Sequence, residues 1–355
     1  MITPAQTLGG VSEEGLLGSI FPFFTPQPGL LVGPGDDAAV VVASGPVVAT
    51  TDAMVRGRDW LDHWSSASDV GSKLLTQNLA DLAAMGAVGT SVLITLVADP
   101  ATPVAWARDF AKAVGEGAAL AGVAVAGGDL SSAPPGVLLV SITALGDLQG
   151  RAPVLRSGAR PGHTVAVCGT LGRSAAGLRL LEAGGHQATD GDLASDGDQT
   201  TDGDQTTDGD QTTDGEHRGI RQLCLDHHRR PTSPLAAGPQ AAVAGASAML
   251  DVSDGLLRDG GRIARASGVC LDLEGAAIAA DVAALAPLLG EAAALDCVLA
   301  GGEEHSLLAT FPSAELPHGW RALGTVREGE GISLDGRSQR QRGWDHFAGD
   351  EPGDG

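Results

Sequence analysis

The spacing of hydrophobic and polar residues predicts alternating helices and strands through the first 150 positions. Residues 12–24 predict a short helix with Ser12 as its N-cap and two glutamates in its first turn. Apolar, β-branched runs at 38–43 and 47–51 flank the turn Ser44-Gly45-Pro46, which predicts a hairpin. The further elements expected here are helix 68–86, strand 92–97, helix 104–120, strand 123–126 and strand 137–145. This alternation predicts an α/β domain spanning residues 1–150.

A second series of strands and helices follows and predicts another α/β domain over residues 151–355. Its expected elements are strand 164–168, helix 174–182, strand 248–252, helix 253–267, strand 269–273 and strand 306–311. A chain of 355 residues with 43% hydrophobic content is long enough for two such domains, each with its own core.

A low-complexity tract at residues 189–216 interrupts the second domain. It contains the hexad Asp-Gly-Asp-Gln-Thr-Thr three times in succession and has no Lys or Arg. Setting aside its ten acidic residues changes the net charge from −22 to −12, so much of the acidity is local. Calcium binding is one interpretation, but the spacing and terminal Glu of an EF-hand are missing. The composition favours a solvated, disordered insertion.

Composition excludes several classes of function. The charge of −22 opposes general binding to nucleic acids or anionic membranes. No apolar run approaches the ~20 residues of a membrane span, and the first twenty residues contain no basic group, so we expect a cytoplasmic protein. The four cysteines form no C-x-x-C pair. Neither of the two lysines, Lys73 and Lys112, lies in a Walker motif.

Aspartates recur beside glycines, at the ends of apolar strands or inside an apolar helix. The positions are Asp36, Asp37, Asp52, Asp81, Asp129, Asp251 and Asp254. Gly33-Pro-Gly35 before the first pair superficially matches a dinucleotide fingerprint, but a β-branched run follows where that motif requires a helix. Desolvating so many carboxylates is costly without cations, and carboxylates without a His or Cys cluster favour magnesium. Magnesium together with phosphate oxygens is typical of nucleotide-dependent phosphoryl transfer.

These segments, in their order along the chain, resemble the thiamine-monophosphate kinase family. The motifs are Gly35-Asp36-Asp37-Ala38-Ala39, Thr50-Thr51-Asp52, Asn78-Leu79-Ala80-Asp81-Leu82-Ala83-Ala84-Met85-Gly86, Gly127-Gly128-Asp129, Asp251-Val252-Ser253-Asp254-Gly255 and Gly301-Gly302-Glu303-Glu304. The resemblance implies the two-domain fold of aminoimidazole-ribonucleotide synthetase, with N-terminal domains that bind ATP and magnesium and pair into a dimeric β-barrel. It also implies ATP-dependent phosphorylation of thiamine monophosphate by direct in-line transfer, assisted by several Mg²⁺ ions.

The resemblance also implies roles for individual residues. The implied metal ligands are Asp37, Thr50, Thr51, Asp52, Asp81, Asp129, Asp251 and Asp254. The implied nucleotide contacts are Gly128, Asp129, Arg156 and Ser253. The implied substrate-side residues are Asp59, Glu303 and Trp344. The acceptor phosphate already presents an anionic oxygen, so no general base is expected, and Asp129 and Arg156 assist the transfer.

Two segments depart from the family pattern. Asp59 stands where the family commonly has His, and Glu304-His305 replaces the common Asp-Tyr. Because of these departures, the alternative that the chain is a catalytically silent nucleotide-binding homologue stays open. A sister enzyme, aminoimidazole-ribonucleotide synthetase, is a further alternative, but there a Lys follows the metal-binding Asp within a few residues, whereas Asp52 and Lys73 are far apart.

Overall fold

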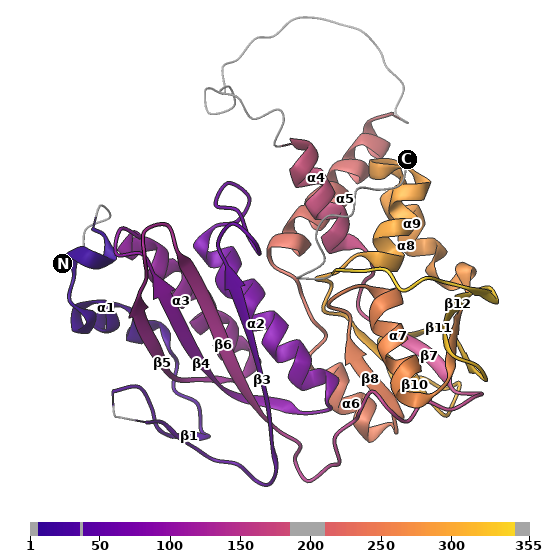
Figure 1. Ribbon diagram of the computed structural model, residues 1–355, viewed down its shortest axis with the longest axis horizontal. Coiled ribbons are helices and arrows are strands. Elements are labelled where there is room, and N and C mark those ends of the chain that lie inside the picture. Colours follow the sequence, from indigo (N-terminus) through magenta and orange to yellow (C-terminus); the bar gives the residue numbers. More distant parts are fainter. Residues whose placement is uncertain (1–5, 36–37, 185–209, 345–355) are drawn as a thin grey trace, which may run out of the picture.

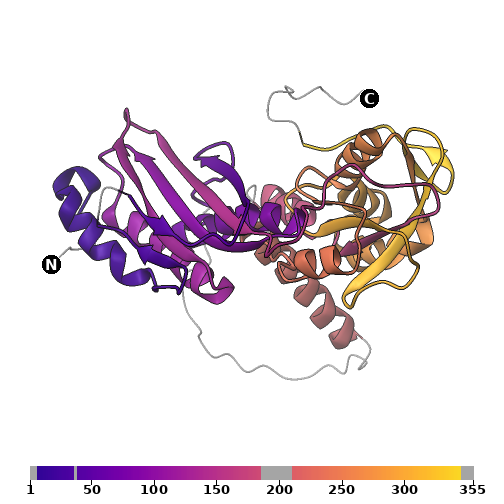
Figure 2. The same ribbon diagram turned by 90° about the horizontal axis from the view of Figure 1, so that it is seen from below.

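The computed structural model describes residues 6–35, 38–184 and 210–344, with residues 210–216 described for the backbone alone. Figures 1 and 2 show two lobes side by side, formed by the N-terminal and C-terminal parts of the chain. One buried hydrophobic cluster draws its residues from between positions 16 and 148, and another from between 159 and 332. A third cluster joins Ala83 and Ala84 to side chains of the second lobe, so the lobes share packed apolar surface.

The first lobe is built on a four-stranded sheet with the order β3-β6-β4-β5. Its strands are β3 (Val47–Val55), β4 (Val88–Ala98), β5 (Ala124–Ser132) and β6 (Leu138–Asp147). Strands β4 and β5 are parallel, and the helix α3 (Val104–Ala121) connects them, while the other neighbours are antiparallel. Asp52 of β3 and Gly128 of β5 lie in one row across the sheet. Ile142 of β6 and Ile94 of β4 lie between them in that row.

Helices cover one face of this sheet (Figure 1). Helix α2 (Ala67–Ala84) begins with a capping box, in which Ser66 and Asp69 each satisfy the other's backbone N–H. On β6, Leu138, Val140 and Ile142 alternate with half-buried residues and are almost fully buried. Since successive strand residues point to opposite faces, this pattern identifies the helix-covered side. The other face includes the exposed side chain of Val47.

Short elements precede the sheet. They are the 3-10 helices η1 (Leu8–Gly10) and η2 (Phe21–Phe23), the helix α1 (Glu13–Ile20), and the paired strands β1 (Leu30–Val32) and β2 (Val40–Val41). The Ser12 side chain accepts a hydrogen bond from the N–H of Gly15, which confirms the predicted N-cap. The α-helix ends at Ile20, earlier than predicted, because Pro22 follows and the chain tightens into η2.

The second lobe contains a seven-stranded sheet with the order β13-β12-β9-β11-β7-β10-β8. Its strands are β7 (Thr164–Cys168), β8 (Ala248–Asp251), β9 (Cys270–Leu273), β10 (Leu307–Phe311), β11 (Trp320–Arg327), β12 (Gly331–Leu334) and β13 (Arg337–Ser338). Only the β9–β12 pair of this sheet is parallel. Its helices are α4 (Arg173–Gly184), α5 (Asp210–Arg229), α6 (Ala237–Val243), α7 (Leu256–Ser267), α8 (Gly275–Leu289) and α9 (Glu291–Ala300).

The predicted hairpin is wrong, because its two runs pair with other strands. Strand β2 pairs with β1, whereas β3 pairs with β6 along its whole length. Ser44, in the turn between the runs, donates from both its N–H and its hydroxyl to Asp147 at the end of β6. This contact directs the chain along β6 instead of back onto β2.

Strands β3 and β5 are among the strands that are longer than their apolar runs indicate. Strand β3 continues past Asp52 to Val55, and β5 continues through Gly128 and Asp129 to Ser132. Both aspartates therefore lie inside strands, not at their ends. Ladder hydrogen bonds to β6 and β4 extend the strands beyond what local hydrophobicity predicts.

The disordered insertion predicted at 189–216 is contradicted at its C-terminal end. The backbone of residues 210–216 belongs to the first turns of α5. Helix α5 as a whole packs against α4. Positions 189–209 lie outside the described residues. In the part of the chain that the structure describes, no helix has the length and apolarity to cross a membrane.

Candidate functional site

Helix α2 presents a polar stripe to the second lobe. Asp69, Lys73, Gln77 and Asp81 follow one another at four-residue spacing, so they share one side of the helix. Three of them meet groups of the second lobe: Asp69 pairs with Arg230, Lys73 with Glu303, and Asp81 faces Asp251. The boundary between the lobes is therefore lined by charge.

The central part of this boundary is a cluster of carboxylates. The hydroxyl of Thr50 on β3 donates a 2.6 Å hydrogen bond to Oδ2 of Asp81. Burial, and then the negative charges of Asp251 and Asp52, raise the pKa of Asp81 to about 7, although the bond from Thr50 opposes them. The cluster therefore concentrates negative charge, which His305 offsets only in part.

His305 is buried beside this cluster. Its Nδ1 lies 3.1 Å from Oδ2 of Asp251, while its buried Nε2 has no hydrogen-bond partner. Burial alone would lower the pKa of His305, but the hydrogen bond and the charge of Asp251 outweigh it and raise the pKa. Residue 305 has a φ of 53°, an uncommon left-handed conformation for a side chain of this size.

Glu303 forms the second charged group at the boundary. Its Oε1 accepts from Nζ of Lys73 at 2.6 Å, and its Oε2 lies 3.5 Å from Nδ1 of His228. Burial would raise the pKa of Glu303, but Lys73 and His228 outweigh it and hold the pKa below its ordinary value. The side chain remains 34% exposed and is therefore accessible to a ligand.

Glu304 stabilises the loop that carries Glu303. The fully buried carboxylate accepts from the hydroxyl of Thr170 and from the N–H of Ser174 at 3.0 Å, with Nε2 of His227 at 3.3 Å. Glu304 thus anchors the loop inside its own lobe.

Asp254 is held by arginines of α7. Its carboxylate pairs with Arg262, and Nε of Arg258 lies 3.8 Å from the same oxygen. Arg258 also donates to the carbonyl of Trp344, whose N–H donates to the carbonyl of Asp254. The predicted ligand and the predicted substrate-side aromatic are thus linked through one arginine.

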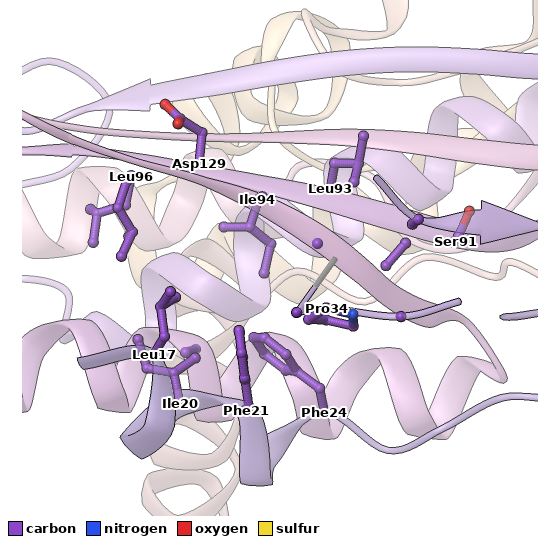
Figure 3. Close-up of a pocket in the computed structure, with 18 of the residues that line it drawn as sticks. Leu17, Ile20, Phe21, Phe24, Pro34, Ser91, Leu93, Ile94, Leu96 and Asp129 are labelled. Atoms are coloured by element: carbon purple, nitrogen blue, oxygen red, sulfur yellow. The ribbon is translucent and has the colours of Figure 1, made fainter. Parts of the chain in front are cut away.

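A cavity of about 620 Å³ lies against β5 in the first lobe. Figure 3 shows Ile94 and Leu96 pointing toward Leu17, Ile20, Phe21 and Phe24, while Asp129 points away from these apolar side chains. Gly128 also lines the cavity, but its lack of a side chain has a local cause: a Cβ there would lie 1.9 Å from the carbonyl oxygen of Ile94.

The structure separates the predicted metal ligands into groups. Thr50, Asp52, Asp81 and Asp251 gather at the lobe boundary. Thr51, the next residue on β3, bonds instead to Thr143 on the opposite face of the sheet, and Asp129 lies on the far edge strand β5. Asp37 lies outside the described residues.

The other predicted positions have local roles. Asp59 accepts from the N–H of Val55 at 2.7 Å and so closes the turn after β3. Ser253 accepts the N–H of Glu303 through its carbonyl, which joins the loop after β8 to the loop after α9. Arg156 is exposed on the segment that follows β6, and its carbonyl accepts from the hydroxyl of Ser267.

The donor set at the boundary suits a hard cation. Its atoms are carboxylate and hydroxyl oxygens, and burial together with the charges of Asp251 and Asp52 raises the pKa of Asp81, so a cation there would relieve an unfavourable charge. Among the described residues, no three His, Cys, Asp or Glu side chains converge tightly enough to hold a metal by themselves. Magnesium, which keeps waters and takes phosphate oxygens, needs only one or two carboxylates.

Sequence reasoning missed Lys73, His227 and His228 as site residues, and it noted His305 only as a departure from the family pattern. Lys73 could have been noticed as one of two lysines, on the same helix face as Asp81. The two histidines at the end of α5 have no motif around them, and only the fold places them beside Glu303 and Glu304.

Comparison with known proteins matches the chain to a family. Residues 35–148 match the model of the AIR synthase related protein, N-terminal domain. The thiamine-monophosphate kinase of Mycobacterium tuberculosis (strain CDC 1551 / Oshkosh) is 40% identical over 326 residues, which cover 90% of this chain and 86% of that protein. The chain belongs to the thiamine-monophosphate kinase family.

Solved structures of thiamine-monophosphate kinases share the fold. The crystal structure from Stenotrophomonas maltophilia K279a has a TM-score of 0.71 and 30% identity, covering 92% of this chain and 98% of that one. A structure described as AaThiL complexed with AMPPCP and TMP has a TM-score of 0.70 and 26% identity, covering 94% and 97%. The expected aminoimidazole-ribonucleotide-synthetase-like α/β fold is thereby confirmed.

Proposed function

We propose that the protein transfers the γ-phosphoryl group of ATP to the phosphate of thiamine monophosphate, giving thiamine diphosphate and ADP. The observation that carries this proposal is the meeting of Asp81 and Asp251 across the lobe boundary, in a chain that is 40% identical to a thiamine-monophosphate kinase. A relative with the same fold binds an ATP analogue together with TMP. Two polyanions must approach in this reaction, and a cation site where both lobes meet is suited to that task.

We propose that Mg²⁺ occupies this cluster. Thr50, Asp52, Asp81 and Asp251 would hold it, and Asp37, Thr51, Asp129 and Asp254 remain predicted ligands. When bound, magnesium neutralises phosphate charge and orients the phosphoryl group for in-line transfer. In this chain, His305 holds the carboxylate of Asp251 and Thr50 holds that of Asp81, so both carboxylates are oriented before the nucleotide arrives.

We place the nucleotide between the cavity against β5 and the lobe boundary. The apolar cavity suits an adenine ring, and Gly128 and Asp129 lie on its wall. Arg156 and Ser253 remain predicted nucleotide contacts, with the arginine offsetting charge on the transferred group. The acceptor phosphate is already anionic, so this chain needs to supply charge and alignment, not a general base.

The substrate's cationic ring belongs beside Glu303. This carboxylate is partly exposed at the lobe boundary, on the same side of α2 as the carboxylate cluster. Trp344, half exposed and tied to Arg258, offers an aromatic face for the ring. Asp59 remains a predicted substrate-side residue.

We also propose a homodimer formed through the open face of the first sheet. Val47, Ala49, Thr51 and Ala53 alternate along β3 as exposed residues, and Leu93 on β4 is 40% exposed on the same face. Closing two such sheets on each other would make the barrel that the family resemblance implies and would bury this apolar surface. The division at residue 150 into nucleotide-binding and C-terminal domains, and the cytoplasmic location, stay predictions.

Measuring ADP release with and without thiamine monophosphate tests the proposed function. We expect release to require both the acceptor and Mg²⁺, with one thiamine diphosphate formed for each ADP. ATP binding without acceptor-dependent ADP release would instead support the catalytically silent homologue.

A further inference from the structure

We propose that Lys73 is a positioning residue for thiamine monophosphate, because its ammonium group holds the Glu303 carboxylate in the orientation that receives the substrate's cationic ring. This inference rests on the proposed function and extends it to a residue of the other lobe. Lys73 belongs to α2, whereas Glu303 lies on the loop after α9. The ring site is therefore completed only when the two lobes are packed together.

The burial of Lys73 indicates a specific role. Its side chain is only 5% exposed, and its Nζ lies 2.6 Å from Oε1 of Glu303. Burying an ammonium group is costly unless a well-placed partner compensates it. The partner here is a carboxylate that is itself 34% exposed, so one side of Glu303 is fixed by the protein and another side is accessible.

The second lobe by itself restrains Glu303 only partly. The backbone is fixed, since the N–H of Glu303 donates to Ser253 and its φ of 58° is a left-handed value. At the side chain, the contact from the same lobe is His228, 3.5 Å away. Burial and the charge of Lys73 lower the pKa of His228 to about 4, so this imidazole is neutral at pH 7. His305 also lowers the pKa of Glu303 electrostatically, but Lys73 is the cation at hydrogen-bond distance from its carboxylate.

Helix α2 sets the spacing between the two ends of the site. Lys73 and Asp81 are eight residues apart on one face, which is about 12 Å along an α-helix. Helix α2 thus positions both parts of the site. Lys73 acts on the ring of thiamine monophosphate through Glu303, and Asp81 acts on the phosphates through the carboxylate cluster. Asp69, four residues before Lys73, pairs with Arg230 in another contact between the lobes that does not involve Glu303.

The experiment measures thiamine diphosphate formation with the full chain, varying thiamine monophosphate and ATP separately. The variants are Lys73→Met, Lys73→Arg, Glu303→Gln, the double variant Lys73→Met/Glu303→Gln, and the control Arg230→Met. Lys73→Met should raise the KM for thiamine monophosphate at least tenfold, with kcat and the KM for ATP changed less than threefold. Lys73→Arg, which keeps the cation, should recover most of that loss. Arg230→Met should leave both KM values within twofold.

The double variant separates positioning from general stabilisation. If Lys73 acts through Glu303, Lys73→Met should add less than twofold to the KM of Glu303→Gln. An unchanged KM in folded Lys73→Met, equal increases for both substrates, or fully multiplicative effects would each overturn the inference. If Lys73→Met does not fold, Lys73→Gln, which keeps a hydrogen-bond donor, is measured against the same criteria. A wild-type protein that makes no thiamine diphosphate would instead refute the proposed function, and the inference with it.

Discussion

The hydroxyl of Thr50 donates a 2.6 Å hydrogen bond to Asp81, which ties strand β3 to helix α2 at the lobe boundary. Thr51, one position later, bonds to Thr143 on the opposite face of the same sheet. The alternation of a β-strand thus sends two adjacent predicted ligands to opposite sides. In this chain the even-numbered residues Thr50 and Asp52 lie on the side of Asp81, and Thr51 lies on the face that we propose for the dimer.

Asp81→Asn should abolish magnesium-dependent turnover without destabilising the fold. The pKa of about 7 shows that the ionised carboxylate is disfavoured where it lies, so its removal costs no folding stability near pH 8. We expect activity to fall at least a hundredfold, and the rise in Tm that Mg²⁺ gives the wild type to shrink. Turnover assays and thermal unfolding with and without Mg²⁺ check this, with Asp109→Asn on the exposed side of α3 as control. A variant that keeps near-normal turnover at limiting Mg²⁺ would remove Asp81 from the metal site.

Ala53→Arg should convert the proposed dimer to single chains. Ala53 is exposed on β3 opposite Ser141, on the sheet face that we propose as the interface. A guanidinium buried there without a partner would oppose association. Sedimentation velocity should give the mass of two chains for the wild type and one for the variant. Leu120→Arg, at the 91% exposed end of α3, should keep the wild-type mass. Two-chain mass in both variants would place the interface elsewhere.

His228 should make the stability depend on pH. Its pKa is about 4 in the folded protein and 6.5 in the reference state, because burial and Lys73 disfavour its charged form. Between these values the unfolded chain binds more protons, so stability falls as the pH drops from 6.5 to 4, by roughly 3 kcal/mol for a shift of this size. Urea unfolding between pH 7 and pH 4 should show a shallower fall in His228→Asn than in wild type. His318→Asn, at an exposed position, should follow the wild-type curve. Parallel curves for all three proteins would contradict the neutral, buried state of His228.

A short and a long deletion in the acidic tract should have different effects on stability. Removing residues 189–209 should leave turnover and Tm nearly unchanged, because polar low-complexity sequence buries no core. Removing residues 189–216 also shortens α5, which packs on α4, and should lower Tm by several degrees. Differential scanning calorimetry distinguishes these outcomes. Loss of activity in the shorter deletion would reopen the calcium interpretation.

Elements with strong local patterns could be predicted from the sequence. Helices α2 and α3 carry clear helical spacing, and strand β7 was predicted at its observed bounds. Strand β3 was predicted too short because its pairing with β6 continues past the apolar run. Helices α8 and α9 were missed, since alanine-rich sequence lacks a polar and apolar alternation to detect.

The site was only partly predictable for a related reason. Motifs identified Asp81 and Asp251, and the structure brings them together. Lys73 and His228 have no motif, and contact with Glu303 depends on how the lobes pack. Local sequence gives no direct information on such long-range contacts.

Isotope transfer tests the central claim most directly. Purified protein is incubated with Mg²⁺, thiamine monophosphate and ATP labelled at the γ-phosphorus, and the products are separated. The account predicts that the label appears in the terminal phosphate of thiamine diphosphate, one for each ADP, and that omitting thiamine monophosphate stops ADP formation. Label released only as inorganic phosphate, or no thiamine diphosphate at any Mg²⁺ concentration, would contradict it.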